Sequence, residues 1–291
     1  MSLLQLGRPG PVGLSSFGPI IVLAILAGLV FAERRARRRG FAKGTMVSCA
    51  TFALAGAFVG CRVVPIVVSP GAFVDSPAEL LRLFTASAGA WYGGFLGGVA
   101  GLVLFCRRRK LEALAVLDVA APAIALGKVI GPFACLAAGC DHGRPAPGVP
   151  WAIVYSDPRS AVSAGFQGIP LHPAPLYDAI ANLAILAGLL LFERHSRRPE
   201  GERRVFGLYC LAYATARFFI ETYRGDASRG LYFGGALSTS QIVSIAIVAA
   251  VLAAALFRRD RALRFGRPRR RPALPIDERL RPIFADERRP R

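Results

Sequence analysis

The sequence has few cysteines and no metal-binding spacing among them. Its six cysteines fall within or at the edges of apolar runs, and neither a Cys-x-x-Cys pair nor a Cys/His zinc pattern occurs. We therefore expect small buried apolar side chains rather than a metal site, with Cys140, on a predicted outer loop, the one to examine. The chain also lacks an internal repeat, which argues against a repeat-built transporter.

Acidic residues are scarce as well. The chain has 18 Asp and Glu against 37 Lys and Arg, which gives a formal net charge of +19. A charge of this size can indicate nucleic-acid binding. The position of the basic residues along the chain points elsewhere, because they alternate with long apolar segments.

Long apolar runs are what the sequence has in abundance. Of the 291 residues, 54% are hydrophobic, and they gather in runs of about 18 to 25 residues, the length that crosses a bilayer core of about 30 Å. Pro122 and Pro132 interrupt the fourth run, which predicts a kink or a partly re-entrant segment. The seven runs are 14–32, 46–68, 88–106, 113–138, 175–192, 205–223 and 238–257.

Basic residues alternate from one side of the predicted membrane to the other. The segments after the first, third, fifth and seventh runs hold 28 of the 37 Lys and Arg, and the opposite side holds 6. Positive charge is retained in the cytoplasm. Only Arg8 precedes the first run, so we predict an uncleaved anchor rather than a signal peptide.

These patterns predict an all-α integral membrane protein of the bacterial inner membrane. It has seven transmembrane helices, an outer N-terminus and a cytoplasmic C-terminus. Residues 1–257 form the membrane domain, and 258–291 form a basic, Pro-rich tail that is predicted to be disordered. The tail serves either as a topology anchor or as a contact for anionic lipids. Nucleic acid is not an expected partner.

Ionisable residues within the apolar runs mark a candidate site. Arg62, Lys128 and Arg217 lie inside runs, where a charge costs about 2.5 to 3.5 kcal/mol on insertion scales. Glu221 and Arg224 follow Arg217 at spacings of four and three, which places all three on one helix face. Two interpretations stay open: a pair that only neutralises buried charge, or a functional group.

The predicted outer loop between the fourth and fifth runs adds acid/base candidates. It holds two of the three histidines, His142 and His172, with Arg144 close to the first. Imidazole exchanges protons near neutral pH, and the arginine fork binds phosphate through two hydrogen bonds. Phospholipid headgroups are the abundant phosphates at the outer face of a bilayer, so the residues suggest a phospholipid substrate or ligand.

Several stretches, in order, resemble the prolipoprotein diacylglyceryl transferase family from about residue 16 to residue 251. The His-Pro-x-x-Leu-Tyr and Arg-Phe-x-x-Glu-x-x-Arg patterns are the most specific. The matching stretches are Gly60-Cys61-Arg62, Trp91-Tyr92-Gly93-Gly94, Leu117-Asp118-Val119-Ala120-Ala121-Pro122, Gly127 to Pro145, Pro150-Trp151, His172 to Asp178, Arg217 to Arg224, and Leu237 to Gln241.

The resemblance implies a transferase that moves the diacylglyceryl group of phosphatidylglycerol to a lipobox cysteine of a prolipoprotein. It implies lipoprotein biosynthesis at the outer face of the membrane, with membrane lipids as partners and without metal or cofactor. Arginines would hold the phosphate leaving group while a base deprotonates the thiol. The expected catalytic residues are His172, His142, Tyr92, Arg217 and Glu221; the expected phospholipid-binding residues are Arg62, Asp118, Lys128, Arg144, Gly93 and Gly94.

The sequence departs from the family pattern at a few positions. Pro132 stands where the family has an arginine, Tyr92 where many members have His, and Asp178 where Glu is usual. Lys128 lies four residues before position 132 and would share its helix face, so we hypothesise that it supplies the missing charge. The alternative function is a member that binds phospholipid or lipoprotein precursor without catalysis, or that acts on another substrate.

Overall fold

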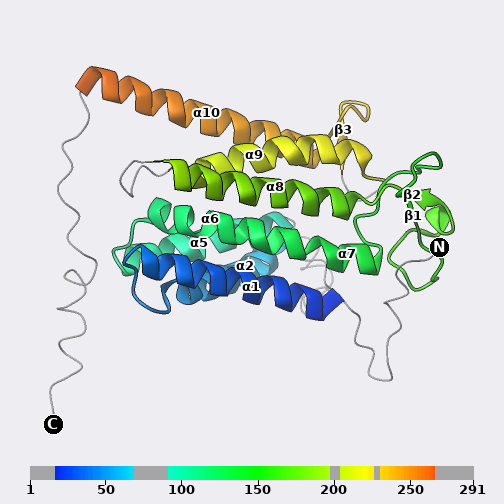
Figure 1. Ribbon diagram of the computed structural model, residues 1–291, viewed down its shortest axis with the longest axis horizontal. Coiled ribbons are helices and arrows are strands. Elements are labelled where there is room, and N and C mark those ends of the chain that lie inside the picture. Colours follow the sequence, from blue (N-terminus) through cyan, green and yellow to red (C-terminus); the bar gives the residue numbers. More distant parts are fainter. Residues whose placement is uncertain (1–16, 69–90, 197–203, 226–229, 266–291) are drawn as a thin grey trace, which may run out of the picture. The chain divides into compact units, whose positions relative to one another are not determined.

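Helices make up most of the chain. The computed structural model describes residues 17–68, 91–196, 204–225 and 230–265. The helices are α1 (Phe17–Arg38), α2 (Thr45–Val68), α5 (Trp91–Arg108), α6 (Ala113–Ile130), α7 (Pro132–Ala138), α8 (Ala174–His195), α9 (Val205–Ile220) and α10 (Thr239–Phe265), with short 3-10 turns η1 (Ala164–Phe166) and η2 (Glu221–Tyr223) (Figure 1).

Every predicted run coincides with a helix in the described part of the chain. Among the described residues, five segments are long and apolar enough to span a membrane: Phe17–Arg38, Thr45–Val63, Ala113–Ala138, Ala174–His195 and Thr239–Phe257. Large apolar side chains such as Leu23, Phe58, Leu183 and Leu256 are exposed on them, as lipid-facing side chains are. The membrane-protein class is therefore confirmed, whereas the number of seven spans stays a prediction.

The ends of two helices differ from the predicted boundaries. The fourth run divides at Gly131 into α6 and α7, because Pro132 begins a new helix at its first position while Pro122 is accommodated inside α6. Helix α10 continues to Phe265, so residues 258–265 of the predicted tail are helical, as their Arg, Ala and Leu favour. Residues 266–291 lie outside the described part.

The chain divides into two compact units, which are described separately. Among the described residues, unit 1 comprises those within 17–31 and 118–265, and unit 2 comprises those within 32–117. In unit 2, helices α2 and α5 pack through glycines. A Cβ atom on Gly56 would collide with the carbonyl oxygen of Gly97, and one on Gly60 with that of Gly93. Small residues of this kind let membrane helices approach closely.

Unit 1 has an apolar core between three helices. It contains Ala121 and Ala125 of α6, Leu186 and Leu189 of α8, and Tyr209 of α9. Two antiparallel pairs of two-residue strands lie in the loops. In the loop from α7 to α8, β1 (Ile153–Val154) pairs with β2 (Pro170–Leu171), and before α10, β3 (Leu231–Tyr232) pairs with β4 (Leu237–Ser238). The loop from α7 to α8 is thus fixed beside the start of α8.

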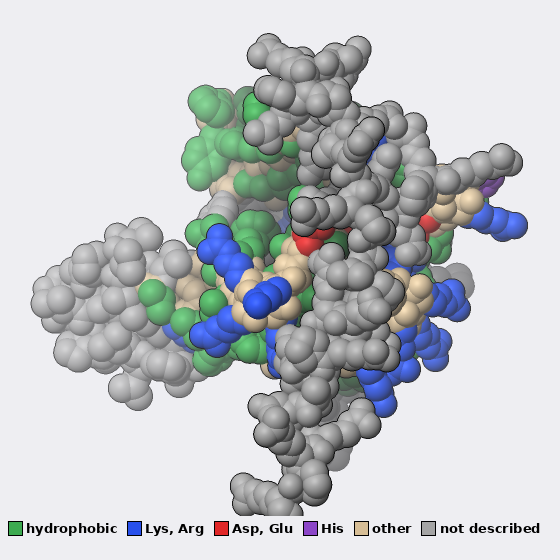
Figure 2. Space-filling model, turned by 90° about the vertical axis from the view of Figure 1, so that its left-hand side faces the viewer, with side chains coloured by type: hydrophobic (Ala, Val, Ile, Leu, Met, Phe, Trp, Pro, Cys, Tyr) green, Lys and Arg blue, Asp and Glu red, His purple; other side chains and the backbone are tan. Residues whose placement is uncertain are grey.

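Basic residues lie in the last turn of several helices. The last turn of α5 carries Arg107 and Arg108, and that of α8 carries Arg194 and His195. Cations at these positions interact favourably with the helix dipole. On the face drawn in Figure 2, Lys and Arg side chains outnumber Asp and Glu side chains.

Candidate active site

Backbone hydrogen bonds in unit 1 bring three separate segments together. The Gly143 amide donates to the His172 carbonyl (3.0 Å), the His172 amide to the Arg144 carbonyl (3.0 Å), and the Arg144 amide to the Tyr223 carbonyl (2.9 Å). A Cβ atom at position 143 would collide with the His172 carbonyl, so only glycine permits this approach. Both predicted histidines and Arg144 are therefore held at one place.

Aromatic rings surround His172. The His172 and Tyr223 ring centroids lie 5.2 Å apart, and those of Tyr177 and Tyr223 lie 5.6 Å apart. The Arg144 guanidinium carbon lies 5.6 Å from the centroid of the Tyr223 ring, within the range of a cation–π contact. Burial, and then the neighbouring charge of Arg144, lowers the pKa of His172 below its ordinary value of 6.5. The imidazole is thereby kept neutral near pH 7.

A chain of hydrogen bonds orients His172. The Trp151 indole N–H donates to the Tyr177 hydroxyl oxygen (2.8 Å), which lies 3.0 Å from His172 Nδ1. Because indole can only donate, the Tyr177 oxygen accepts from Trp151 and keeps its own proton available for Nδ1. When Tyr177 donates to Nδ1, the proton of the neutral imidazole resides on Nε2, and His172 presents an N–H donor there.

His142 has the opposite tautomer. Its side chain is only 3% exposed, and its Nδ1 lies 3.1 Å from the Gly143 carbonyl oxygen. A carbonyl can only accept, so Nδ1 carries the proton and Nε2 keeps its lone pair. The ring packs 5.2 Å from that of Phe166. His142 therefore has the tautomer that a proton acceptor requires.

A buried carboxylate joins two arginines at the end of α9. Arg217 Nη2 lies 2.8 Å from Glu221 Oε2, and Arg224 Nε lies 3.9 Å from the same oxygen. Arg217 also donates to Ser240 Oγ (3.3 Å), while Arg224 forms an ion pair with Asp141. Glu221 is 1% exposed. Arg217 of α9, Glu221 of η2 and Arg224, which follows η2, come together as their spacing predicted, and Asp141 links them to the loop after α7.

Lys128 is paired with Asp178. Lys128 Nζ lies 2.7 Å from Asp178 Oδ2, and the amide nitrogen of the fully buried Asn182 donates to Asp178 Oδ1 (3.1 Å). Pro132 itself is buried at the start of α7. The positive charge proposed to replace the family arginine thus lies four residues before position 132, in the last turn of α6, with a carboxylate partner that partly neutralises it.

The structure does not bring Asp118 to the other predicted residues of unit 1. Its Oδ1 accepts a hydrogen bond from the Phe206 amide (2.8 Å), in the first turn of α9, where the orphan amides of a helix need acceptors. Asp118 precedes Lys128 by ten residues of α6, about 15 Å along the helix. Its role as a lipid contact stays a prediction, and its observed contact is with a helix end.

The remaining predicted residues belong to unit 2. The Arg62 guanidinium carbon lies 5.2 Å from the Phe58 ring centroid. Gly93 is in close backbone approach to Gly60, and a Cβ atom on Gly94 would have room, 3.8 Å from the nearest atoms. The Tyr92 side chain lies outside the described part of the structure.

Four residues of the site were not among those predicted: Trp151, Tyr177, Tyr223 and Asp141. Tyr177 and Trp151 stood within matched stretches, and a hydroxyl five residues after His172 was the available signal. Tyr223 lies between two predicted charges. Asp141 had no signal in its spacing, since Arg224, its partner, is 83 residues away.

Long apolar helices, with arginines, a buried carboxylate and two histidines at one site, define an integral membrane protein that is suited to an anionic group. The family model described as prolipoprotein diacylglyceryl transferase matches residues 4–257. The chain belongs to this family of transferases, as the sequence motifs predicted.

Curated relatives agree with this assignment. A protein of Clostridium tetani is 31% identical over 229 residues, which cover 79% of this chain and 87% of the relative. One of Finegoldia magna is 30% identical over 80% of this chain and 87% of its own length. A protein of Rhodococcus jostii is 31% identical over 87% of this chain and 74% of its own length. All three are named phosphatidylglycerol–prolipoprotein diacylglyceryl transferase.

Proposed function

We propose that this chain transfers the diacylglyceryl group of phosphatidylglycerol to the thiol of a lipobox cysteine in a prolipoprotein. Membership of the family supports the reaction. The observation that carries the proposal is the convergence of Arg144, His172 and the Arg217–Glu221–Arg224 cluster in unit 1. Buried charges are costly in a membrane and persist where they serve a site.

The proposed step is a displacement at the glyceryl carbon. The cysteine sulfur forms a bond to this carbon, the carbon–oxygen bond to phosphate breaks, and glycerol phosphate leaves with the electron pair. The thiol proton passes to a base. Arginines oppose the charge that develops on the leaving phosphate. No redox partner is required.

The tautomers favour different roles for the two histidines. His142 has a free Nε2 lone pair, which suits the proton acceptor, and His172 has an Nε2–H that suits a donor to phosphate. Tyr92 remains a third candidate base. Arg62, Asp118, Lys128, Arg144, Gly93 and Gly94 remain proposed phospholipid-binding residues.

The test is an assay of the purified chain with phosphatidylglycerol and a lipobox peptide, followed by mass spectrometry of the peptide. A diacylglyceryl mass increase on the cysteine supports the proposal, and a Cys-to-Ser peptide is the control for the acceptor. An unmodified peptide after incubation with folded protein would overturn it.

A second candidate function rests on Pro132, which offers neither a charge nor a donor where the family has arginine. In this alternative the chain binds phospholipid or lipoprotein precursor without turnover, or uses another substrate. The transfer assay distinguishes the two functions, and Lys128→Ala beside Arg217→Ala tests whether Lys128 replaces the arginine. If Lys128 replaces the arginine, both variants lose activity. Full activity of Lys128→Ala would reject that compensation.

We further propose that the chain spans the bacterial inner membrane seven times, with an outer N-terminus, a cytoplasmic C-terminus and its active site toward the outer face. The 28 to 6 distribution of basic residues supports this topology. The loop that carries His142 and His172 falls on the outer side in this arrangement.

A further inference from the structure

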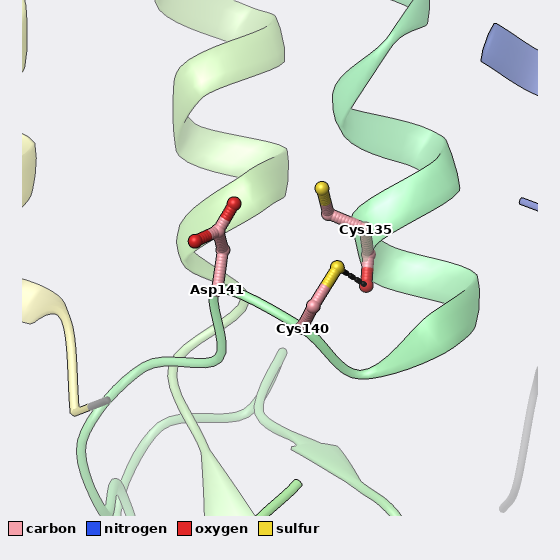
Figure 3. Close-up of side chains that lie close together, drawn as sticks. All are labelled: Cys135, Cys140 and Asp141. Carbon is pink, nitrogen blue, oxygen red and sulfur yellow. Dashed lines mark hydrogen bonds between the residues drawn. The ribbon is translucent and has the colours of Figure 1, made fainter. Parts of the chain in front are cut away.

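Two thiols and a carboxylate meet beside the candidate active site. The sulfur atoms of Cys135 and Cys140 and a carboxylate oxygen of Asp141 all lie within 4.8 Å of one another. Figure 3 shows the three side chains directed toward a common space at the end of α7. None of the three takes part in the transfer chemistry proposed above.

The turn that ends α7 creates this cluster. Gly139 adopts a left-handed conformation (φ 81°) and Asp141 another (φ 57°), which Gly and Asp tolerate better than other residues. Cys140 consequently folds back over the last turn of the helix, with its sulfur 3.9 Å from the Cys135 carbonyl oxygen. The Tyr155 hydroxyl, which donates to the Leu136 carbonyl (2.9 Å), fixes the end of this helix.

Arg224 orients the third ligand. It binds Oδ1 of Asp141, which leaves Oδ2 for another partner. A carboxylate that is held on one oxygen by a charged donor and binds a cation through the other is a common outer-shell arrangement in metal sites. The Asp141 side chain is 46% exposed, so a cation can reach the cluster from solvent.

We propose that Cys135, Cys140 and Asp141 bind one thiophilic divalent cation of the Zn²⁺ class. Thiolate sulfur and carboxylate oxygen are established ligands of this cation, at about 2.3 Å and 2.0–2.2 Å, and three protein ligands leave a fourth tetrahedral position for water. Binding releases the two thiol protons to solvent. A one-residue step from Cys140 to Asp141 forms no familiar metal motif, which is why the sequence pattern did not indicate the site.

The site is coupled to the arginine cluster through Asp141. The cation would bind one oxygen of this carboxylate while Arg224 binds the other, and Arg224 also approaches Glu221. A bound cation therefore fixes the segment from α7 to Arg144 relative to η2. Its binding does not depend on whether the chain transfers diacylglyceryl groups.

A second thiol pair supplies a matched control. Cys49 of α2 and Cys106 of α5 are both buried and interact with each other. Within the described residues, no third His, Cys, Asp or Glu ligand atom completes a cluster with them. A site that needs three ligands is therefore expected only at the end of α7.

The experiment uses the reduced full-length chain in detergent. Zn²⁺ binding is titrated in competition with a chromophoric chelator, and Cd²⁺ binding is followed by the thiolate-to-metal charge-transfer absorbance. We expect one equivalent per chain. The C135S/C140S variant should lose it, C49S/C106S should keep it, and D141N should bind at least about tenfold more weakly. Thermal unfolding of each variant establishes that it is folded.

Two results would overturn the proposal: no binding by the reduced wild-type chain, or equal binding by folded C135S/C140S. Retention of Zn²⁺ by C135S/C140S but not by C49S/C106S would place the site at the other thiol pair.

Discussion

Arg217 and Glu221 depend on each other because the carboxylate is buried away from water. Their ion pair measures 2.8 Å and the carboxylate is almost completely buried. Breaking a buried ion pair costs about 3 to 5 kcal/mol, and the partners that would remain are weaker: Arg224 at 3.9 Å for the carboxylate and the Ser240 hydroxyl for the guanidinium. The same guanidinium is among the arginines proposed to bind the leaving phosphate, so stability and catalysis are both affected by this residue.

We therefore expect Arg217→Ala to lower the transfer rate about 100-fold or more and to lower the melting temperature. Arg217→Lys should keep the charge and much of the stability but lose at least about tenfold in rate, since Lys lacks the planar fork. The rate is measured by mass spectrometry of the peptide. Arg159→Ala, at an exposed pair with Asp157, is the control. A fully active Arg217→Ala would contradict the proposed role.

His172 carries a pH dependence with a definite sign. Burial and Arg144 lower the pKa of its imidazole, so the folded chain binds this proton less tightly than the unfolded chain. The stabilisation is complete above the unfolded pKa of about 6.5 and is lost as the pH falls through the lowered folded pKa. We expect the melting temperature to drop between about pH 8 and pH 5, and to drop less in His172→Gln.

The control for this measurement is His195→Gln, at the opposite end of α8 from His172. It should follow the wild-type pH dependence of the melting temperature. An identical pH dependence in wild type and His172→Gln would mean that His172 contributes no proton linkage, and would remove it as a titrating member of the site.

At the scale of elements, helices could be predicted and their partners could not. Hydropathy encodes the length that a bilayer imposes, so α1, α2 and α8 follow their runs closely. The pairing of Lys128 with Asp178, and of Asp118 with the start of α9, depends on the rotation and tilt of each helix. Packing against neighbouring helices sets these angles. Residue spacing predicts which residues share a face of one helix, but it does not predict which neighbouring helix that face contacts.

The same limit of residue spacing explains which residues of the candidate active site could be predicted. Arg217, Glu221 and Arg224 could be grouped because they share one face of one element. Asp141 was missed because its partner, Arg224, comes from another segment, whereas Tyr177 stands only five residues after His172 and its spacing was not used. Pro132 was identified as a departure from the family pattern, and the end of α6 at Gly131 shows how the chain accommodates it.

The glycine contact between α2 and α5 gives a prediction about packing. A methyl group on Gly56 would meet the backbone of Gly97, and overpacking of this kind costs about 1 to 3 kcal/mol. We expect Gly56→Ala to lower the melting temperature of the chain in detergent. Gly188→Ala in α8, with nothing within 4 Å of the added carbon, should be neutral or slightly stabilising. Equal melting temperatures for both variants would contradict the close packing.

Asp118 allows its two possible roles to be separated. As an acceptor for the first turn of α9, its replacement by Ala should cost about 1 kcal/mol of stability with little change in KM for phosphatidylglycerol. If Asp118 is instead a lipid contact, its replacement by Ala should raise KM for phosphatidylglycerol and leave the melting temperature unchanged. We expect the first result, from the hydrogen bond to Phe206. Asp157→Ala, in an exposed loop, is the matched control.

For the whole molecule, charge and hydropathy must agree on one topology. An odd number of spans places the termini on opposite sides, and the basic segments then fall together on the side of the C-terminus. Five spanning segments are evident among the described residues. Helices α5 and α9, with 18 and 16 residues, are the two that would complete seven.

Fusions of reporters at loop positions test this arrangement. Green fluorescent protein, which folds in the cytoplasm, should fluoresce when fused after Arg109 or after the last residue, and alkaline phosphatase, which is active outside, should be active after Gly148. A fluorescent fusion at Gly148 would place the histidine loop in the cytoplasm, away from the expected substrate. Phosphatase activity at both Gly148 and the C-terminus would mean an even number of spans between them, and either α9 or another helix would then lie along the membrane rather than across it.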